Sequence, residues 1–232
     1  MDSINPIIGL DRSVFFFFNS HHNAFWDVVM RLMTDTPYWL IFYLPIIIYI
    51  IYKYRMKSVI ILILIALGIV ICDQLSGIVK ESVQRLRPTH DPSIKDMVHY
   101  VISRGGKYGS FSSHASNTFF AAMFTSRLFH QKRFSYLIFF WAALVSYTRI
   151  YLGVHYPLDI LSGLLFGLMV GYLLYRLLLF IETRFWLLKL PKITDIHLSK
   201  KEFQTILIIF LTMIGLTLII VARLQHYHMI VL

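Results

Sequence analysis

The sequence is poor in charged residues and holds one cysteine, and each shortage excludes a class of protein. Charged residues make up 15% of the 232 residues, whereas soluble domains have about 25%. Hydrophobic residues reach 57% and come in long runs, which disfavours a soluble domain and favours an integral membrane protein. Cys72 lies inside one of these runs, and a single cysteine forms no internal disulfide.

The sequence also lacks a signal-peptide pattern and an interdomain linker. Its start carries no cluster of Lys or Arg, and the apolar run from Val14 to Phe18 gives way to the polar stretch 19–23. We find no segment that would separate two domains. We therefore expect residues 1–232 to form a single membrane-embedded domain.

The chain has a formal net charge of +10, an excess that would suggest nucleic-acid binding in a soluble protein. Here many basic residues flank apolar runs, and the rest fall largely in three short segments. Topology signals and an anionic substrate account for both groups. We expect the bilayer and this substrate as partners, and neither nucleic acid nor an obligate protein partner.

Six apolar segments are long enough to be spanning helices. They cover residues of about 37–53, 57–80, 113–130, 134–151, 156–182 and 203–224. The sequence therefore predicts an all-α, polytopic membrane helical bundle of about six transmembrane helices. The fifth segment carries Gly163, Gly167 and Gly171, and this spacing of four lets a neighbouring helix approach closely.

Residues 1–34 form an N-terminal segment in which aromatic side chains occur among polar ones. No apolar run of 18 residues occurs in it. We expect one or two amphipathic helices that lie at the membrane interface. The alternative is a short, broken first span, so whether residues 13–34 span the membrane or lie on it stays open.

Lys and Arg residues in the short connections predict the orientation of the chain. The connections 53–57, 127–133 and 184–201 are rich in them and should be cytoplasmic. The connections 81–112 and 150–155 then lie on the opposite side. The first of these is also basic, but we attribute its Arg87 to chemistry rather than to topology.

Three short segments place basic or imidazole side chains at the ends of expected spans. Ionisable groups near hydrocarbon are costly, so such a cluster is a functional-site hypothesis. With six alternating spans, all three segments meet at the same membrane face. They are KESVQRLRP with Lys80 and Arg87, SFSSH ending in His114, and TRIYLGVHYPLD with Arg149, His155 and Asp159.

The spacing within these segments predicts how the side chains cooperate. His155 and Asp159 are four residues apart, so they share a helix face and the carboxylate can fix the imidazole tautomer. Ser112, Ser113 and His114 begin the third span, where the exposed N–H groups of a helix N-terminus favour a phosphate.

The first segment should continue the second span. Lys80 and Arg87 are seven residues apart, so both point the same way on a helix that continues to Pro88. Asp73 lies seven residues before Lys80, deeper in the span. We expect it to be an inner anchor for the bundle or for the lysine stem, or a polar contact between helices without a catalytic part.

Together the segments supply three cations, two imidazoles, one orienting carboxylate and a helix N-terminus. This set suits a phosphate site with a nucleophile and a proton donor. It lacks the dense carboxylates that bind magnesium or calcium. Two histidines and a carboxylate could hold a transition metal, but the nearby cations oppose this, so we expect neither a metal nor a cofactor.

The three segments resemble the motifs of the type 2 phosphatidic acid phosphatase superfamily, which are K-x6-R-P, P-S-G-H and S-R-x5-H-x3-D. The first motif is fully matched by KESVQRLRP. The third is matched by TRIYLGVHYPLD, with Thr148 in place of serine. The second reads Phe111-Ser112-Ser113-His114, so its proline and glycine are replaced. The resemblance covers residues 73–171.

The resemblance implies a role for each matching residue. His155 would be the nucleophile that forms a phosphohistidine, with Asp159 behind it, and His114 would be the general acid. The phosphoryl oxygens would be held by Lys80, Arg87, Arg149, Ser112 and the Ser113 amide. Phosphatases of this family need no metal. The catalytic core would be residues 57–182, with 203–224 as an additional span.

The resemblance also implies an integral-membrane lipid phosphatase or diphosphatase. We expect it in a bacterial inner membrane with its site facing the periplasm, because the basic connections should be cytoplasmic. Undecaprenyl diphosphate, phosphatidylglycerol phosphate and lipid A phosphates are the leading substrates, and residues 89–111 would form a loop over the substrate. The alternatives are a lipid phosphotransferase with the same site, and a non-enzymatic phospholipid-binding or transport protein. The lipid, the choice between hydrolysis and transfer, and the oligomeric state stay open.

Overall fold

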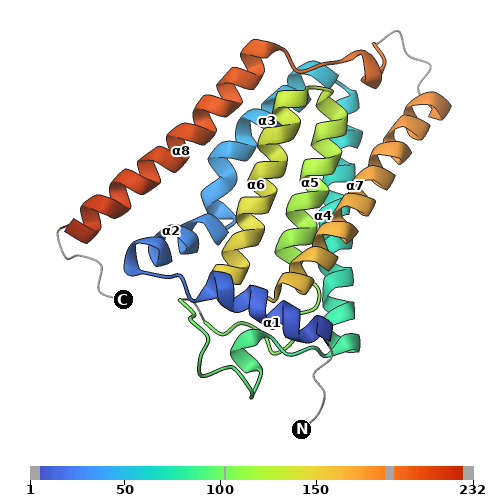
Figure 1. The fold of residues 1–232 in the computed structure, drawn as a ribbon. Coiled ribbons are helices and arrows are strands. Elements are labelled where there is room, and N and C mark those ends of the chain that lie inside the picture. The colour runs from blue at the N-terminus through green and yellow to red at the C-terminus, as the bar shows by residue number, and fades with distance from the viewer. Residues whose placement is uncertain (1–5, 102, 186–190, 227–232) are drawn as a thin grey trace.

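The computed structural model describes residues 6–101, 103–185 and 191–226, and all long elements within them are helices (Figure 1). The α-helices are α1 Pro6–Asn19, α2 Ala24–Thr34, α3 Leu40–Tyr54, α4 Lys57–Val83, α5 Ser113–Phe129, α6 Lys132–Tyr151, α7 Pro157–Phe185 and α8 Lys200–His226. Short 3-10 helices are η1 Pro37–Trp39, η2 Pro88–His90 and η3 Ile193–Asp195. The predicted all-α membrane bundle is confirmed.

Helices occupy all six positions at which the sequence predicts spans. Four of them are long and apolar enough to cross a membrane, namely Pro37–Tyr54, Lys57–Val83, Pro157–Arg184 and Lys200–His226. The other two, α5 and α6, lie in the middle of the bundle (Figure 1) and bury large aromatic residues. The protein is therefore an integral membrane protein, while the count of six spans stays a prediction.

The glycines of α7 form its contact with α5. A Cβ atom on Gly163 would lie 2.6 Å from the carbonyl oxygen of Ser112, and one on Gly167 would lie 2.3 Å from that of Ser116. No real side chain fits at such distances, so these positions let the two helices pack backbone to backbone. This packing sets the start of α7 against the start of α5, where two of the predicted motifs lie.

The N-terminal helices lie at one end of the bundle, and α1 runs across the ends of the longer helices rather than along them (Figure 1). The buried side chain of Asn19 fixes this position. Its Nδ2 donates to the carbonyl oxygens of His99 at 2.9 Å and Tyr151 at 2.8 Å, and its Oδ1 accepts the His99 N–H at 2.9 Å. Neither α1 nor α2 is among the helices long and apolar enough to cross a membrane, and the interfacial position of residues 1–34 stays a prediction.

The opposite end of the bundle is closed by a buried ion pair. The Lys57 Nζ lies 2.6 Å from Glu182 Oε1 and also donates to the Pro191 carbonyl at 2.8 Å. The same carboxylate oxygen accepts the Ile193 N–H at 2.8 Å. A buried charge is tolerated when it is paired and hydrogen-bonded in this way, so this contact joins the start of α4 to the end of α7.

Candidate active site

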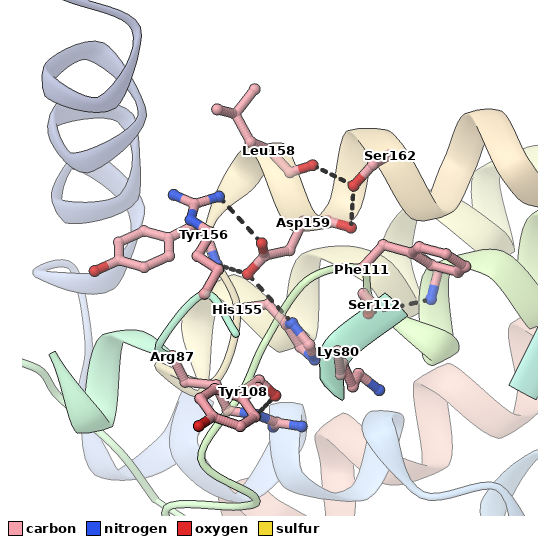
Figure 2. A network of polar contacts seen from close by, with 12 residues as sticks. Lys80, Arg87, Tyr108, Phe111, Ser112, His155, Tyr156, Leu158, Asp159 and Ser162 are labelled. Atoms are coloured by element: carbon pink, nitrogen blue, oxygen red, sulfur yellow. Dashed lines mark hydrogen bonds and ion pairs between the residues drawn. The ribbon is translucent and has the colours of Figure 1, made fainter. Parts of the chain in front are cut away.

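Four helix ends meet at the end of the bundle where α1 lies (Figure 1). They are the last turns of α4 and α6 and the first turns of α5 and α7. The three predicted motifs occur at these ends, so the structure confirms that they share one face. Figure 2 shows the polar contacts at this place, with Lys80, Arg87 and Asp159 drawn around His155.

The predicted continuous helix from Lys80 to Arg87 is wrong. The helix α4 ends at Val83 because Gln84 adopts a left-handed conformation with φ 52° and ψ 28°. Arg87 therefore follows the helix in extended backbone, and Pro88 begins η2 instead of ending α4. The guanidinium is held from another direction, because its Nε donates to the Tyr108 carbonyl oxygen at 3.0 Å.

The paired His155 and Asp159 meet as predicted, although not on one helix. The helix α7 begins at Pro157, so His155 lies in the preceding turn. Its Nδ1 is 3.5 Å from Asp159 Oδ2, and Figure 2 shows the carboxylate directed at the ring. This contact is too long for a good hydrogen bond, and such contacts tighten when a substrate binds. The fully buried carboxylate also accepts the Tyr156 N–H at 3.0 Å.

The environment of His155 keeps its ring neutral. Burial lowers the pKa of His155 to about 4, and the charges of Arg87 and Arg149 act in the same direction, while Asp159 opposes them. The neutral form therefore predominates at pH 7. Since Nδ1 faces Asp159, the Nε2 lone pair is available for nucleophilic attack.

The start of α5 has the geometry predicted for binding an anion. Ser112 is the N-cap, and its Oγ accepts the Ala115 N–H at 3.4 Å while its own N–H donates to the Asp159 carbonyl oxygen at 3.0 Å. Ser112 is fully buried, so it shapes the helix start and ties it to α7. Within the described residues, the N–H groups of Ser113 and His114 have no partner, and they are the groups that bind anions at a helix N-terminus.

The three predicted cations converge on the two histidines. The charges of Lys80, Arg87 and Arg149 are all close enough to His114 to act on it, as is His155 itself. Lys80 Nζ donates to the Ser113 Oγ at 3.4 Å.

Arg149 is the most buried of these cations, with 7% of its surface exposed. Its Nη1 donates to Thr34 Oγ1 at 2.6 Å, but its buried Nε has no partner within the described residues. A buried N–H donor without a partner is costly unless a ligand satisfies it. Arg149 is thus positioned to receive an anionic oxygen.

Asp73 lies apart from this cluster. Its side chain is exposed, and within the described residues it forms no hydrogen bond or ion pair. Its charge is near enough to act on Lys80, but the expected anchoring contact is not formed. The other sequence-predicted site residues all lie at the common face.

The structure adds Arg85, a basic residue of the connection 81–112 to which the motifs assign no role. Its Nη1 lies 3.1 Å from Asp159 Oδ1, and its Nη2 forms an ion pair with Asp11 of α1. The guanidinium also lies over the ring of Tyr156, 4.4 Å from its centroid. Arg85 therefore holds the carboxylate that faces His155. Its position inside the first motif was the available signal, whereas nothing local pointed to Asp11.

The connection between α4 and α5 passes close to these side chains. A Cβ on Gly109 would lie 2.9 Å from Asp159 Oδ2, and one on Gly105 would lie 2.7 Å from Arg87 Nη1. Backbone bonds fix the base of this connection, because the Gly109 N–H donates to the Arg85 carbonyl oxygen at 2.9 Å. Small residues are needed here so that the backbone can approach the charged groups.

A buried neutral imidazole backed by a carboxylate, surrounded by cations and a helix N-terminus, defines a phosphoryl-transfer site within a membrane helical bundle. Comparison with known proteins agrees with this class. The sequence model of the PAP2 superfamily matches residues 57–183, which is more than half of the chain, and the chain belongs to this superfamily. The resemblance inferred from the three motifs is confirmed.

Among curated proteins, the chain is 36% identical to the lipid A 4′-phosphatase of Porphyromonas gingivalis over 184 residues, which is 78% of each chain. It is also 36% identical to the lipid A 4′-phosphatase of Bacteroides thetaiotaomicron over 170 residues, covering 72% of this chain and 76% of that protein. The undecaprenyl-diphosphatase BcrC of Bacillus subtilis is 26% identical over 85 residues, covering 37% and 43%.

Two solved structures share the fold. A transmembrane PAP2-type phosphatidylglycerolphosphate phosphatase from Bacillus subtilis has a TM-score of 0.60 at 21% identity, covering 80% of this chain and 91% of that one. Aquifex aeolicus LpxE has a TM-score of 0.56 at 22% identity, covering 76% and 98%. The predictions of a helical membrane fold and of a membrane lipid phosphatase are confirmed.

Proposed function

We propose that this membrane lipid phosphatase acts on lipid A and hydrolyses the phosphomonoester at its 4′ position. The observation that carries the proposal is the 36% identity to a lipid A 4′-phosphatase over 78% of this chain. The similarity extends well beyond the short motifs. By contrast, the match to the undecaprenyl-diphosphatase BcrC covers 37% of the chain.

Binding of the phosphate is the first step of the proposed reaction. Lys80, Arg87 and Arg149 hold the non-bridging oxygens, and the unpartnered Nε of Arg149 supplies one of the hydrogen bonds. The free N–H groups at the start of α5 add further donors. These groups stabilise the charge that builds up on the oxygens during transfer.

The chemistry then follows in two displacements. Nε2 of His155 attacks phosphorus, and the bond from phosphorus to the lipid oxygen breaks. His114 is protonated once the bound phosphate anion has offset the surrounding cations, and it gives its proton to that oxygen. Asp159 stabilises the positive charge on the phosphorylated imidazole. Water next attacks phosphorus while His114 accepts its proton, so inorganic phosphate leaves and His155 regains its lone pair.

The same site supports a second candidate function, the hydrolysis of a polyprenyl diphosphate. The similarity to the undecaprenyl-diphosphatases, which covers only part of the chain, favours this second function. The discriminating experiment measures phosphate release by the purified protein from each of three substrates in the same detergent. These substrates are lipid A, undecaprenyl diphosphate and phosphatidylglycerol phosphate. We expect the highest kcat/KM on lipid A, with a product that has lost its 4′-phosphate. Equal or faster release from undecaprenyl diphosphate would favour the second candidate.

We also propose that the protein lies in a bacterial inner membrane with its site facing the periplasm. Basic connections at the opposite end support this orientation. In a Cys72→Ala background, cysteine replacing the exposed Lys107 should react with an impermeant thiol reagent in spheroplasts, and cysteine replacing the exposed Lys132 should not. The reverse pattern would invert the topology.

A further inference from the structure

A second cluster of potential ligands lies away from the phosphate site, between the N-terminal helices and the connection that follows η2. It consists of His22 in the turn between α1 and α2, Asp27 in the first turn of α2, and His99. One ligand atom from each residue lies within 4.8 Å of the other two. His22 and Asp27 are near each other in the chain, but His99 lies 72 residues beyond Asp27, so the fold brings His99 to the other two.

The side chains of this cluster lie in contact, and one pair of ligand atoms is already aligned. The rings of His22 and His99 are stacked, with centroids 3.6 Å apart and planes within 4° of parallel. The His99 Nε2 lies 2.8 Å from Asp27 Oδ1. Stacked rings do not direct their in-plane nitrogen lone pairs at one point, so the exposed His22 ring must turn about its side-chain torsions to bind the same ion as His99 and Asp27. The backbone can stay in place.

We propose that His22, Asp27 and His99 bind one divalent transition-metal ion of the Zn²⁺ type. Imidazole nitrogen and carboxylate oxygen are ligands that Zn²⁺ takes at about 2.0–2.2 Å. Tetrahedral ligands at that radius are about 3.4 Å apart. The ion would replace the proton between His99 and Asp27, and the contact between them would lengthen slightly to admit it.

Neighbouring residues form hydrogen bonds that orient Asp27 and His99, as is usual around metal sites. Tyr151 donates its hydroxyl to Asp27 Oδ1 at 2.7 Å and orients the carboxylate. Asn19 binds both the N–H and the carbonyl oxygen of His99, which fixes the backbone of that ligand. Asp27 is buried but His22 is exposed, so an ion has a path from solvent and water can complete its coordination.

The role of this site is structural. The metal would join the turn between α1 and α2 to the connection that carries His99. Through Tyr151 it would also be linked to the end of α6, two residues beyond Arg149. None of the three ligands belongs to the phosphate site, so the ion would stabilise the outer loops without taking part in the displacement at phosphorus.

The test is Zn²⁺ binding to the full-length protein in detergent. The protein is purified with a tag that contains no histidine, treated with a chelator to remove bound metal, and then separated from the chelator. Competition with a chromophoric chelator gives stoichiometry and affinity. We expect one Zn²⁺ per chain and a rise in Tm of about 5 °C at saturation. His22→Ala and Asp27→Asn should each weaken binding more than about tenfold.

His21→Ala is the matched control, because His21 is the exposed neighbour whose ring bonds to the Phe17 carbonyl oxygen instead. It should bind Zn²⁺ as tightly as the unaltered protein. His22→Ala removes only an exposed ring, so the variant is expected to fold. Failure of the unaltered protein to bind Zn²⁺, or unchanged binding in both His22→Ala and Asp27→Asn, would overturn the proposal.

Discussion

The two ends of the bundle treat their buried charges in opposite ways. At the end away from the site, Lys57 and Glu182 have side chains only 4% and 9% exposed, and they neutralise each other at 2.6 Å. Their other bonds go to backbone groups of residues 191 and 193. Lys53 is likewise paired with Glu202 at 2.9 Å. These two pairs are satisfied within the protein, so they join helices and bind no ligand.

The site end keeps polar atoms without partners. Arg149 Nε and His155 Nδ1 are two of the five buried side-chain N and O atoms that have no hydrogen-bond partner within the described residues. Lys80 has one long hydrogen bond, to Ser113 at 3.4 Å. The difference teaches that basic residues at the ends of membrane helices divide into two kinds. Paired ones hold helices or other charged side chains in place, and unsatisfied ones form a site for an anion.

Among the variants that test this contrast, the largest loss of kcat is expected for His114→Ala. This substitution should lower kcat on a lipid phosphate by about 10²–10⁴-fold, since general acid catalysis contributes that much. An activated aryl phosphate has a leaving group that departs without a proton, so the loss there should be much smaller. The measurement is kcat on both substrates. An equal loss on both would assign His114 to phosphate binding or to activation of His155 instead.

Arg85 should have the next largest effect, because it acts through Asp159 rather than on the phosphate. We expect Arg85→Ala to lower kcat by about 10–100-fold, the range typical of residues that orient a reacting group, with a smaller change in KM. Arg85→Lys should recover part of the loss. The matched control is Arg12→Ala, whose ion pair with Asp91 at 2.8 Å does not touch Asp159. If the Arg12 and Arg85 variants lose activity equally, Arg85 has only a structural role.

The lowered pKa of His155 predicts how the activity falls at low pH. The nucleophile must be neutral, and burial lowers its pKa to about 4, so the reactive form is present above that pH and is lost as pH falls through it. The acid limb of the kcat/KM profile should therefore lie near pH 4 on an aryl phosphate. A limb near the ordinary histidine pKa of about 6.5 would show that the site does not keep His155 neutral as described.

The smallest effect on activity is expected at the opposite end. Glu182→Gln leaves Lys57 buried without its counter-charge and should cost about 3–5 kcal/mol of stability. The double variant Lys57→Met with Glu182→Leu should recover much of this. For both variants, kcat calculated per folded molecule should stay within about twofold of that of the unaltered protein. Thermal unfolding and kcat measured on the same samples check this, and a large fall in kcat for the double variant would break the contrast between the ends.

The sequence was sufficient for those parts of the site that depend on helix ends. Apolar runs placed the ends, and spacing within each motif placed Lys80, His114, Arg149 and His155 at one face. Local rules were less reliable at the ends themselves. The left-handed residue Gln84 ends α4 four residues before Pro88, and a single αL residue of this type has no strong sequence signal.

Contacts across long stretches of chain were beyond prediction from sequence. Asp11 reaches Arg85 across 74 residues, and Asp27 reaches His99 across 72. Neither pair shares a helix or a motif, so periodicity carries no information about them. Asp73 shows the converse, because helical spacing from Lys80 predicted a shared face, yet its side chain is exposed.

The most direct test of the account is whether phosphate becomes attached to His155. Protein mixed with phosphorus-32-labelled substrate and quenched in alkaline detergent should carry label that is stable to base and labile to acid, as a phosphohistidine is. The label should map to the peptide containing residue 155 and be absent from His155→Ala, which should also lack turnover. Turnover by His155→Ala, or label attached to another residue, would contradict the claim that the unsatisfied end of the bundle works by covalent catalysis at His155.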